Sequence, residues 1–187
     1  MRIISGSAKG RKIKTPEGLD TRPTSDRVKQ SVFNIILKYI FDAKVLDLFG
    51  GTGNLGIESI SRGCESCVFC EENKKSFEIL RENVKTLGFE NKATIYNKDA
   101  FKVLEQLSRE NKKFNVVFLD PPYGKGLVEK SIENINRLDL LEDDGIIIAE
   151  YDNVDNLVEK IGRINVYRTE KYGRIMISFY KVEVEGE

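Results

Sequence analysis

From about residue 44 onward, short apolar runs alternate with helical patterns, and this alternation constrains the fold more than any other feature. The apolar runs occupy residues 45–49, 67–71, 93–97, 116–120 and 145–151. Between them, apolar residues recur at helical spacing over 55–62, 73–87, 101–111 and 127–137. Strands and helices that alternate in this way build parallel βαβ units. The pattern predicts an α/β fold with a doubly wound, mostly parallel sheet, which binds ligands at the carboxyl ends of its strands.

The flanking segments complete the prediction. Residues 2–5 and 11–14 have the pattern of a small hairpin or arm. A helix should follow Pro23, capped by Thr24 and ending near residue 41, and another should cover 154–161. Residues 164–169 and 175–184 should form an antiparallel C-terminal hairpin, which gives about seven strands. At 187 residues we expect one domain, with residues 1–20 as a basic N-terminal arm.

The charge of the chain is unevenly distributed. The formal net charge is zero, but residues 1–30 carry a net charge of +5 and the remainder −5. A basic arm on an acidic body favours a polyanion at one end only, although a solvated basic face would have the same composition. The candidate RNA-binding residues are Arg11, Lys12, Arg22 and Arg27.

Membrane insertion and secretion find no support in the apolar pattern. No stretch approaches the roughly 20 apolar residues of a membrane span, and residues 1–7 lack the apolar core of a signal peptide. We therefore expect a cytoplasmic protein.

A glycine-rich turn follows the strand predicted over 45–49. Gly51, Gly53 and Gly56 match the spacing of the dinucleotide-binding fingerprint, and Glu71 lies about 20 residues further on, at the tip of the next strand, where it could bind a ribose hydroxyl. Alone, this pattern is weakly specific. Asp47 makes the pattern more specific, because a carboxylate just before the turn repels a pyrophosphate and suits a cationic ligand such as S-adenosylmethionine.

The later strand tips carry further polar groups. Asp99 with Ala100 follows the third strand and could accept a hydrogen bond from an adenine amino group. The fourth strand ends in Asp120, Pro121, Pro122 and Tyr123. Two prolines cannot extend a sheet ladder, so this turn presents free carbonyl oxygens, a carboxylate and an aromatic face to one small volume. That set suits a flat base with an exocyclic NH₂ group, although a proline-terminated strand with an incidental Tyr is the plainer interpretation.

The three cysteines do not indicate a metal centre. Cys67 and Cys70 fall in a predicted strand, where positions three apart point to opposite faces, and the chain has no His to complete a tetrahedral site. We expect these two residues and Cys64 to be small core residues and no metal to be bound. The absence of His also excludes mechanisms that use an imidazole base.

Residues 21–34, 45–63, 68–83 and 116–123 resemble the bacterial methyltransferases that modify guanine N2 in small-subunit (16S) ribosomal RNA, and the basic opening 1–18 is similar to theirs. The resemblance covers nearly the whole chain. It implies a class I methyltransferase fold, S-adenosylmethionine as donor, and a 16S rRNA hairpin loop within an assembled or assembling subunit as target. Gly50, Cys64 and Cys70 stand where the family usually has Ala, Ala and Val, and none of these departures changes a charge.

The resemblance also implies roles for individual residues. Asp47, Gly51 and Gly53 would line the methionine side of the donor, Glu71 would bind its ribose, and Asp99 with Ala100 would meet its adenine. The base would be held by Asp120, Pro121, Pro122 and Tyr123. Three alternatives remain open: a methyltransferase of the same fold acting on adenine N6 in DNA or RNA, one acting on a protein glutamine amide, and a non-enzymatic RNA-binding module. A dehydrogenase is disfavoured by Asp47.

Overall fold

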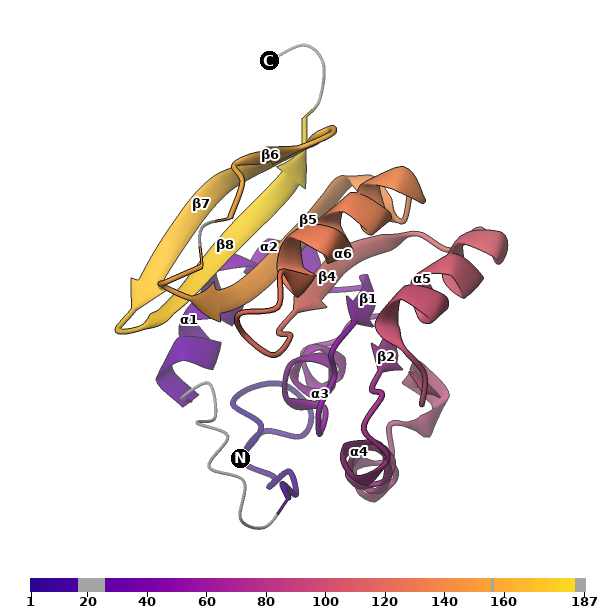
Figure 1. Ribbon diagram of the computed structural model, residues 1–187. Coiled ribbons are helices and arrows are strands. Elements are labelled where there is room, and N and C mark those ends of the chain that lie inside the picture. The colour runs from indigo at the N-terminus through magenta and orange to yellow at the C-terminus, as the bar shows by residue number, and fades with distance from the viewer. Residues whose placement is uncertain (17–25, 156, 184–187) are drawn as a thin grey trace.

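The computed structural model describes residues 1–16, 26–155 and 157–183. Its strands form one eight-stranded sheet in the order β3-β2-β1-β4-β5-β8-β7-β6 (Figure 1). The strands are β1 (Lys44–Asp47), β2 (Ser66–Cys70), β3 (Ala93–Tyr96), β4 (Phe114–Leu119), β5 (Leu141–Asp152), β6 (Lys160–Ile161), β7 (Ile164–Tyr172) and β8 (Ile175–Val182). Strands β1 to β5 are parallel, and β6 to β8 add antiparallel pairs beside β5. The predicted doubly wound, mostly parallel fold is confirmed.

Helices cover both faces of this sheet. The helices are α1 (Asp26–Ile35), α2 (Leu37–Ile40), α3 (Asn54–Ser61), α4 (Lys74–Leu87), the 3-10 turn η1 (Glu90–Lys92), α5 (Ala100–Arg109) and α6 (Leu127–Arg137). Buried side chains of α1 to α4 belong to one core cluster, and those of α5 and α6 to the other. Figure 1 shows α6 in front of β4 and β5. The connections therefore change face between α4 and α5. In such a sheet the ligand crevice lies at the carboxyl ends of β1 and β4, whose following helices pack on opposite faces.

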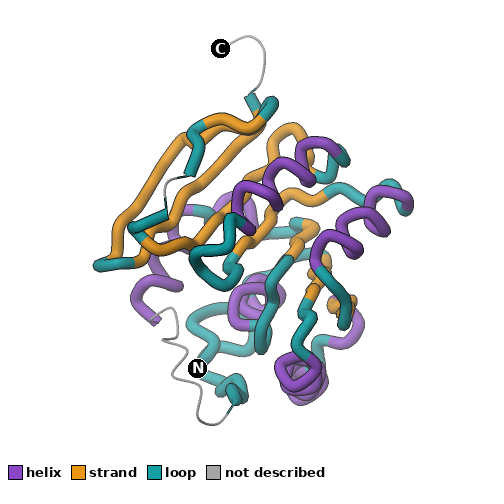
Figure 2. The backbone as a smooth tube through the Cα atoms, in the orientation of Figure 1, coloured by secondary structure: helices purple, strands orange, loops and turns teal. Residues whose placement is uncertain are grey.

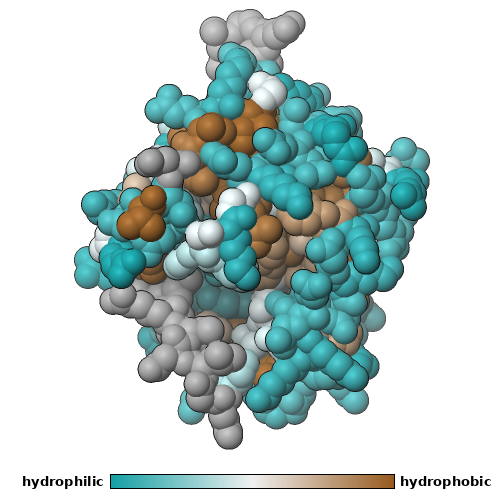
Figure 3. Space-filling model, viewed as in Figure 1, coloured by the Kyte–Doolittle hydropathy of each residue, from teal (hydrophilic) through white to brown (hydrophobic). Residues whose placement is uncertain are grey.

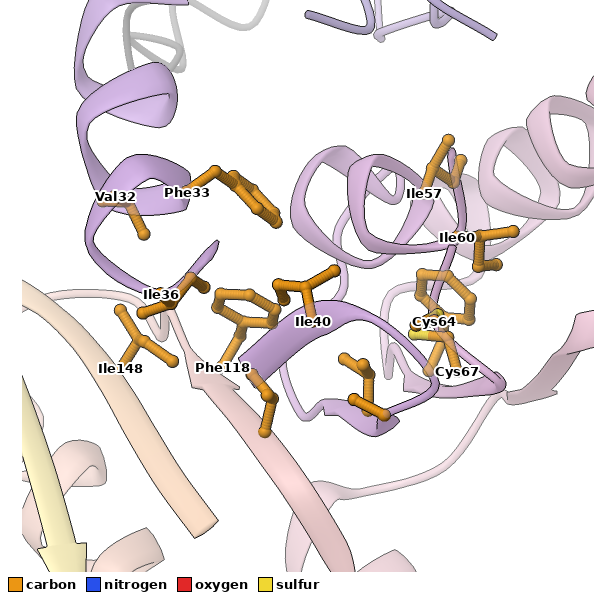
Figure 4. Packing of buried hydrophobic residues seen from close by; sticks show 14 of the residues in the cluster. Val32, Phe33, Ile36, Ile40, Ile57, Ile60, Cys64, Cys67, Phe118 and Ile148 are labelled. Atoms are coloured by element: carbon orange, nitrogen blue, oxygen red, sulfur yellow. The ribbon is translucent and has the colours of Figure 1, made fainter. Parts of the chain in front are cut away.

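The core on the α1 side is built from aromatic and branched side chains. Phe33 of α1 lies against Phe118 of β4, with ring centroids 5.8 Å apart. Figure 4 shows Ile57 and Ile60 of α3 pointing into the same layer. Each of these side chains is almost completely buried, which stabilises the fold by about 1.5–3 kcal/mol per residue. This layer fixes α3, and so the turn before it, on the sheet.

Two of the predicted elements are wrong in their details. Of the segment 154–161, residues 154–155 and 157–159 lie in turns and loops and residues 160–161 form the short β6, so no helix is found in its described part. Val154 is 73% exposed, so its apolar spacing does not mark a buried face. The strand β6 raises the number of strands from seven to eight. The helix expected up to residue 41 divides at Ile36 into α1 and α2, and its predicted start at Pro23 and Thr24 lies outside the described residues.

The described part of the N-terminal arm, residues 1–16, forms a hairpin-like loop. Arg2 and Lys12 form an antiparallel bridge, and Gly10 N–H donates to the Ile3 carbonyl at 2.8 Å. Figure 2 shows the arm as a looped tube beside α3. Asn83 of α4 holds its end, since it accepts from Lys14 N–H at 2.9 Å and donates to the Lys14 carbonyl at 3.0 Å.

A buried ion network fastens the arm to α1 and α3. The Glu58 carboxylate accepts from the backbone N–H groups of Ile4 and Ser5 and pairs with Arg62 at 2.8 Å and Lys29 at 3.2 Å. Lys29 Nζ also donates to Asn54 Oδ1 at 2.9 Å, at the start of α3. Burial lowers the pKa of Lys29, which the Glu58 charge partly offsets. Breaking one partner of such a pair leaves an uncompensated buried charge.

The surface mixes polar and apolar regions. On the face shown in Figure 3, hydrophilic side chains border hydrophobic ones near the middle. Among the described residues, no helix is long and apolar enough to cross a membrane.

Candidate active site

A cavity of about 1040 Å³ opens at the carboxyl ends of the parallel strands. Its walls come from the turn after β1, the ends of β2 and β5, the start of α5 and the turn after β4. Residues of the N-terminal arm and of the turn between β7 and β8 complete its rim. The volume is at the upper end of the range for small-molecule sites, which leaves room for more than one ligand group.

The glycine turn forms one wall of the cavity. Gly51 has a φ of +53° and Gly53, at the start of α3, a φ of +95°. A Cβ added to Gly56 would lie 2.2 Å from a ring carbon of Phe69, so α3 packs directly on β2 because no side chain intervenes. These are the roles expected of a fingerprint whose backbone approaches a ligand closely.

Two of the predicted residues, Asp47 just before this turn and Gly53 within it, are not among the residues that line the cavity. Asp47 is buried, and its Oδ2 accepts a hydrogen bond from Gly56 N–H at 2.9 Å. Burial raises the pKa of its carboxyl to about 7, which the hydrogen bond from Gly56 partly opposes. The structure thus gives Asp47 an indirect place in the site, through the shape of the turn and its charge.

Glu71 connects the tip of β2 to the glycine turn. Its Oε2 accepts from Gly51 N–H at 2.8 Å, and its Oε1 accepts from Asn73 N–H at 2.7 Å. Burial raises the pKa of this carboxyl, which the two backbone hydrogen bonds oppose. The carboxylate lines the cavity, and each oxygen can accept a further hydrogen bond, so the predicted ribose contact fits its position.

Asp99 and Ala100 line the cavity next to Glu71, at the start of α5. Asp99 Oδ1 caps this helix by accepting from Lys102 N–H at 3.0 Å. The Phe101 ring belongs to the same wall and adds an aromatic surface. An adenine ring placed here would meet both an acceptor and an apolar face.

The proline turn follows β4, the neighbour of β1, and lines the same cavity as the glycine turn. All four of its predicted residues line the cavity: Asp120, Pro121, Pro122 and Tyr123. Tyr123 is 42% exposed, and its hydroxyl donates to Glu150 Oε1 at 2.7 Å. Burial raises the pKa of Asp120 well above its ordinary value, and the charges of Glu150 and Asp47 add to the effect.

Glu150 is the main site residue that the sequence interpretation missed. Leu119 of β4 pairs with Ala149 of β5, so Asp120 and Glu150 are the next residues along two neighbouring parallel strands. Glu150 lines the cavity and is only 7% exposed. The rule that located the other acids, a carboxylate at the tip of a predicted strand, would have found it as well.

The candidate RNA-binding residues do not share one environment. Arg11 donates through Nη2 to the Thr86 carbonyl at 2.6 Å, near the end of α4. Lys12 on the arm and Arg27 on α1 are exposed, and Arg22 lies outside the described residues. Contact with RNA stays a prediction for all four.

Cys67 and Cys70 point to opposite faces of β2, as predicted, because they belong to different core clusters. Burial raises the pKa of Cys70 and that of Cys64 to about 12. In the part of the chain that the structure describes, no group of three or more potential metal ligands comes together.

Comparison with known proteins identifies the family. The family model described as "Conserved hypothetical protein 95" matches residues 1–181. "Putative rRNA methyltransferase YlbH" of Bacillus subtilis is 41% identical over 181 residues, covering 97% of this chain and 98% of that protein. "Ribosomal RNA small subunit methyltransferase D" of Escherichia coli K12 is 33% identical, covering 100% of this chain and 92% of that protein.

A solved structure shares the whole fold. "Putative methyltransferase yhhF from Escherichia coli" superposes with a TM-score of 0.87 at 33% identity, over 99% of each chain. The two chains therefore share their fold over nearly their whole length. Since the family model matches nearly the whole chain, this chain belongs to the family described as "Conserved hypothetical protein 95".

Proposed function

We propose that this protein transfers a methyl group from S-adenosylmethionine to the exocyclic N2 of a guanine in small-subunit (16S) ribosomal RNA. The observation that carries the proposal is that the glycine turn and the Asp120 to Tyr123 turn line one cavity. The full-length relationship to a small-subunit rRNA methyltransferase supports RNA as the substrate. Such a substrate would place the protein in the cytoplasm, with an assembled or assembling small subunit as its partner.

The charges of the cavity fit S-adenosylmethionine. Among the described residues, six acidic side chains line the cavity, against three basic ones, Lys98, Lys125 and Arg174. This balance suits a sulfonium and an ammonium group and disfavours a pyrophosphate. Glu71 would hold the ribose, and Asp99, Ala100 and Phe101 would hold the adenine. When bound, S-adenosylmethionine supplies an electrophilic methyl group.

The proline turn would position the base. The lone pair of the guanine amino group is delocalised into the ring and reacts poorly until it is drawn out of the ring plane. The Asp120 carboxylate and neighbouring carbonyl oxygens can accept its N–H hydrogens, while the Tyr123 ring stacks on the base. Holding the reacting atoms in line contributes up to about 7–11 kcal/mol to lowering the barrier.

The same turn offers a proton acceptor. The nitrogen becomes strongly acidic when its new bond to carbon forms, so it gives its proton to Asp120 or to water. Burial raises the pKa of Asp120, which favours the form that holds this proton once the transfer is complete.

Substitution of Asp120 tests the proposal. Asp120→Ala should abolish methyl transfer and leave most of the donor affinity, because the carboxylate would act on the base. In Asp120→Asn an oxygen acceptor remains but the charge is lost, so kcat should fall by orders of magnitude, on the order of 10²-fold or more, with little change in RNA binding. Small-subunit particles that lack the modification are incubated with each variant and S-adenosylmethionine. The methylated nucleosides are then measured by mass spectrometry.

N2-methylguanosine from the wild-type protein is the expected product. N6-methyladenosine in any RNA or DNA would overturn the substrate assignment, and methylated glutamine in a ribosomal protein would point to the amide alternative. Wild-type activity in Asp120→Asn would show that orientation of the amine suffices.

A further inference from the structure

Tyr123 stands on a turn that gives its ring little support of its own. The next residues include Gly124 and Gly126, with φ values of +71° and +63°. A Cβ added to either glycine would meet no atom within 4 Å, so the sides of the turn are open. The ring itself is 42% exposed. A side chain in this setting needs a fixed contact elsewhere if it is to stay in one orientation.

Glu150 provides such a contact from a rigid part of the sheet. Its backbone lies in β5, which pairs with β4 on one side and β8 on the other, where Glu150 is opposite Ile177. Its Oε1 accepts from the Tyr123 hydroxyl at 2.7 Å. A hydrogen bond to a buried carboxylate is stronger than one between neutral groups. A second contact of the turn, from Gly124 N–H to Asp155 Oδ2, is longer, at 3.4 Å.

We infer that Glu150 is a positioning residue for the methyl-transfer reaction, which holds the Tyr123 ring against the base through the hydrogen bond to its hydroxyl. The inference rests on the proposed function, which places the base beside this ring. Both residues line the main cavity and also a smaller one of about 180 Å³ that adjoins it. Without the hydrogen bond the ring could turn into that smaller space and leave the base without its stacking partner.

A double-mutant cycle tests the inference. Tyr123→Phe keeps the ring and removes the hydroxyl, and Glu150→Ala removes the acceptor. Each should lower kcat by about 10- to 100-fold, the range for losing a hydrogen bond to a charged group. The double variant should be no slower than the slower single variant, because both changes break the same bond. Glu150→Gln keeps an oxygen acceptor, so it should recover part of the activity lost in Glu150→Ala.

Donor affinity separates positioning from a general structural effect. The dissociation constant of S-adenosylmethionine, measured by calorimetry, should stay within about twofold of wild type in all these variants. The hydrogen bond between Tyr123 and Glu150 orients the ring that stacks on the base and does not hold the donor. Circular dichroism checks that each variant is folded. Glu129→Gln is the matched control, since Glu129 also borders the smaller cavity and accepts from Val158 N–H at 2.9 Å. Its activity should equal that of wild type.

Two results would overturn the inference. One is a double variant whose loss is the product of the two single losses, which would show that the residues act independently. The other is wild-type activity in Tyr123→Phe. The wild-type reaction keeps the two claims apart: a methylated product other than N2-methylguanosine refutes the guanine assignment, and the coupling of Tyr123 and Glu150 is then measured on that product.

Discussion

Replacing Asp47 with Asn should stabilise the folded protein, and the gain should grow with pH. The carboxyl is buried behind the glycine turn, and burial raises its pKa from 3.8 to about 7. An acid with a raised pKa binds its proton more tightly in the folded chain than in the unfolded one. Its contribution to stability is complete below about pH 4 and is lost as the pH rises through about 7.

The size of the effect follows from the shift. One pKa unit corresponds to about 1.4 kcal/mol, so the rise from 3.8 to about 7 corresponds to roughly 4 kcal/mol lost above neutral pH. About 1.5–2 kcal/mol of this is already lost at pH 5, which leaves about 2–3 kcal/mol between pH 5 and pH 8. Asn has no charge but keeps an oxygen for Gly56 N–H, so the variant lacks this pH dependence.

Urea unfolding followed by circular dichroism measures the difference, because the chain has no Trp for fluorescence. The advantage of Asp47→Asn over wild type in free energy of unfolding should be about 2–3 kcal/mol greater at pH 8 than at pH 5. Taking the difference between the two proteins at each pH cancels the other titrating groups. An advantage of equal size at both pH values would refute the reasoning. The variant should also bind S-adenosylmethionine more weakly at pH 8, because it lacks the negative charge behind the turn.

Two further predictions concern ligand binding. Glu71→Ala should weaken S-adenosylmethionine binding by about 1–3 kcal/mol, since it removes the proposed ribose acceptor and the support of Gly51 N–H; an unchanged dissociation constant in calorimetry would place ribose recognition elsewhere. Replacing both Lys12 and Arg27 with Ala should reduce the slope of log K for RNA binding against log salt concentration by up to about two units. Donor affinity should not change. An unchanged slope would assign these two exposed residues to a solvated face.

The central sheet was predictable because its strands are buried on both faces and so consist of continuous apolar runs. Because parallel strands end at the same edge of a sheet, the order of elements alone placed Asp99, Asp120 and the glycine turn at one edge. The helix over 154–161 failed because local spacing cannot show whether apolar residues face a core, and Val154 and Val158 are 73% and 46% exposed.

Individual side-chain contacts could not be predicted from the sequence pattern. Asp47 illustrates the limit: its position before the glycine turn was evident, but its hydrogen bond to Gly56 N–H depends on the fold of the turn. The pair of Tyr123 and Glu150 likewise depends on the register of β4 against β5. An acid in a predicted strand does not reveal its partner until the neighbouring strand is known.

The way the arm is held also sets an order of events during synthesis. Ile4, Ser5 and Ala8 find hydrogen-bond partners on α3, 53 or 54 positions further along the chain. Lys14 finds Asn83 69 positions further along. At about 5–20 residues per second, the ribosome makes these partners several seconds after the arm. Asn83 also donates to the Thr52 carbonyl, so the arm and the glycine turn acquire a common support only when α4 is complete. Docking of the end of the arm and support of the glycine turn at Thr52 therefore both wait for α4.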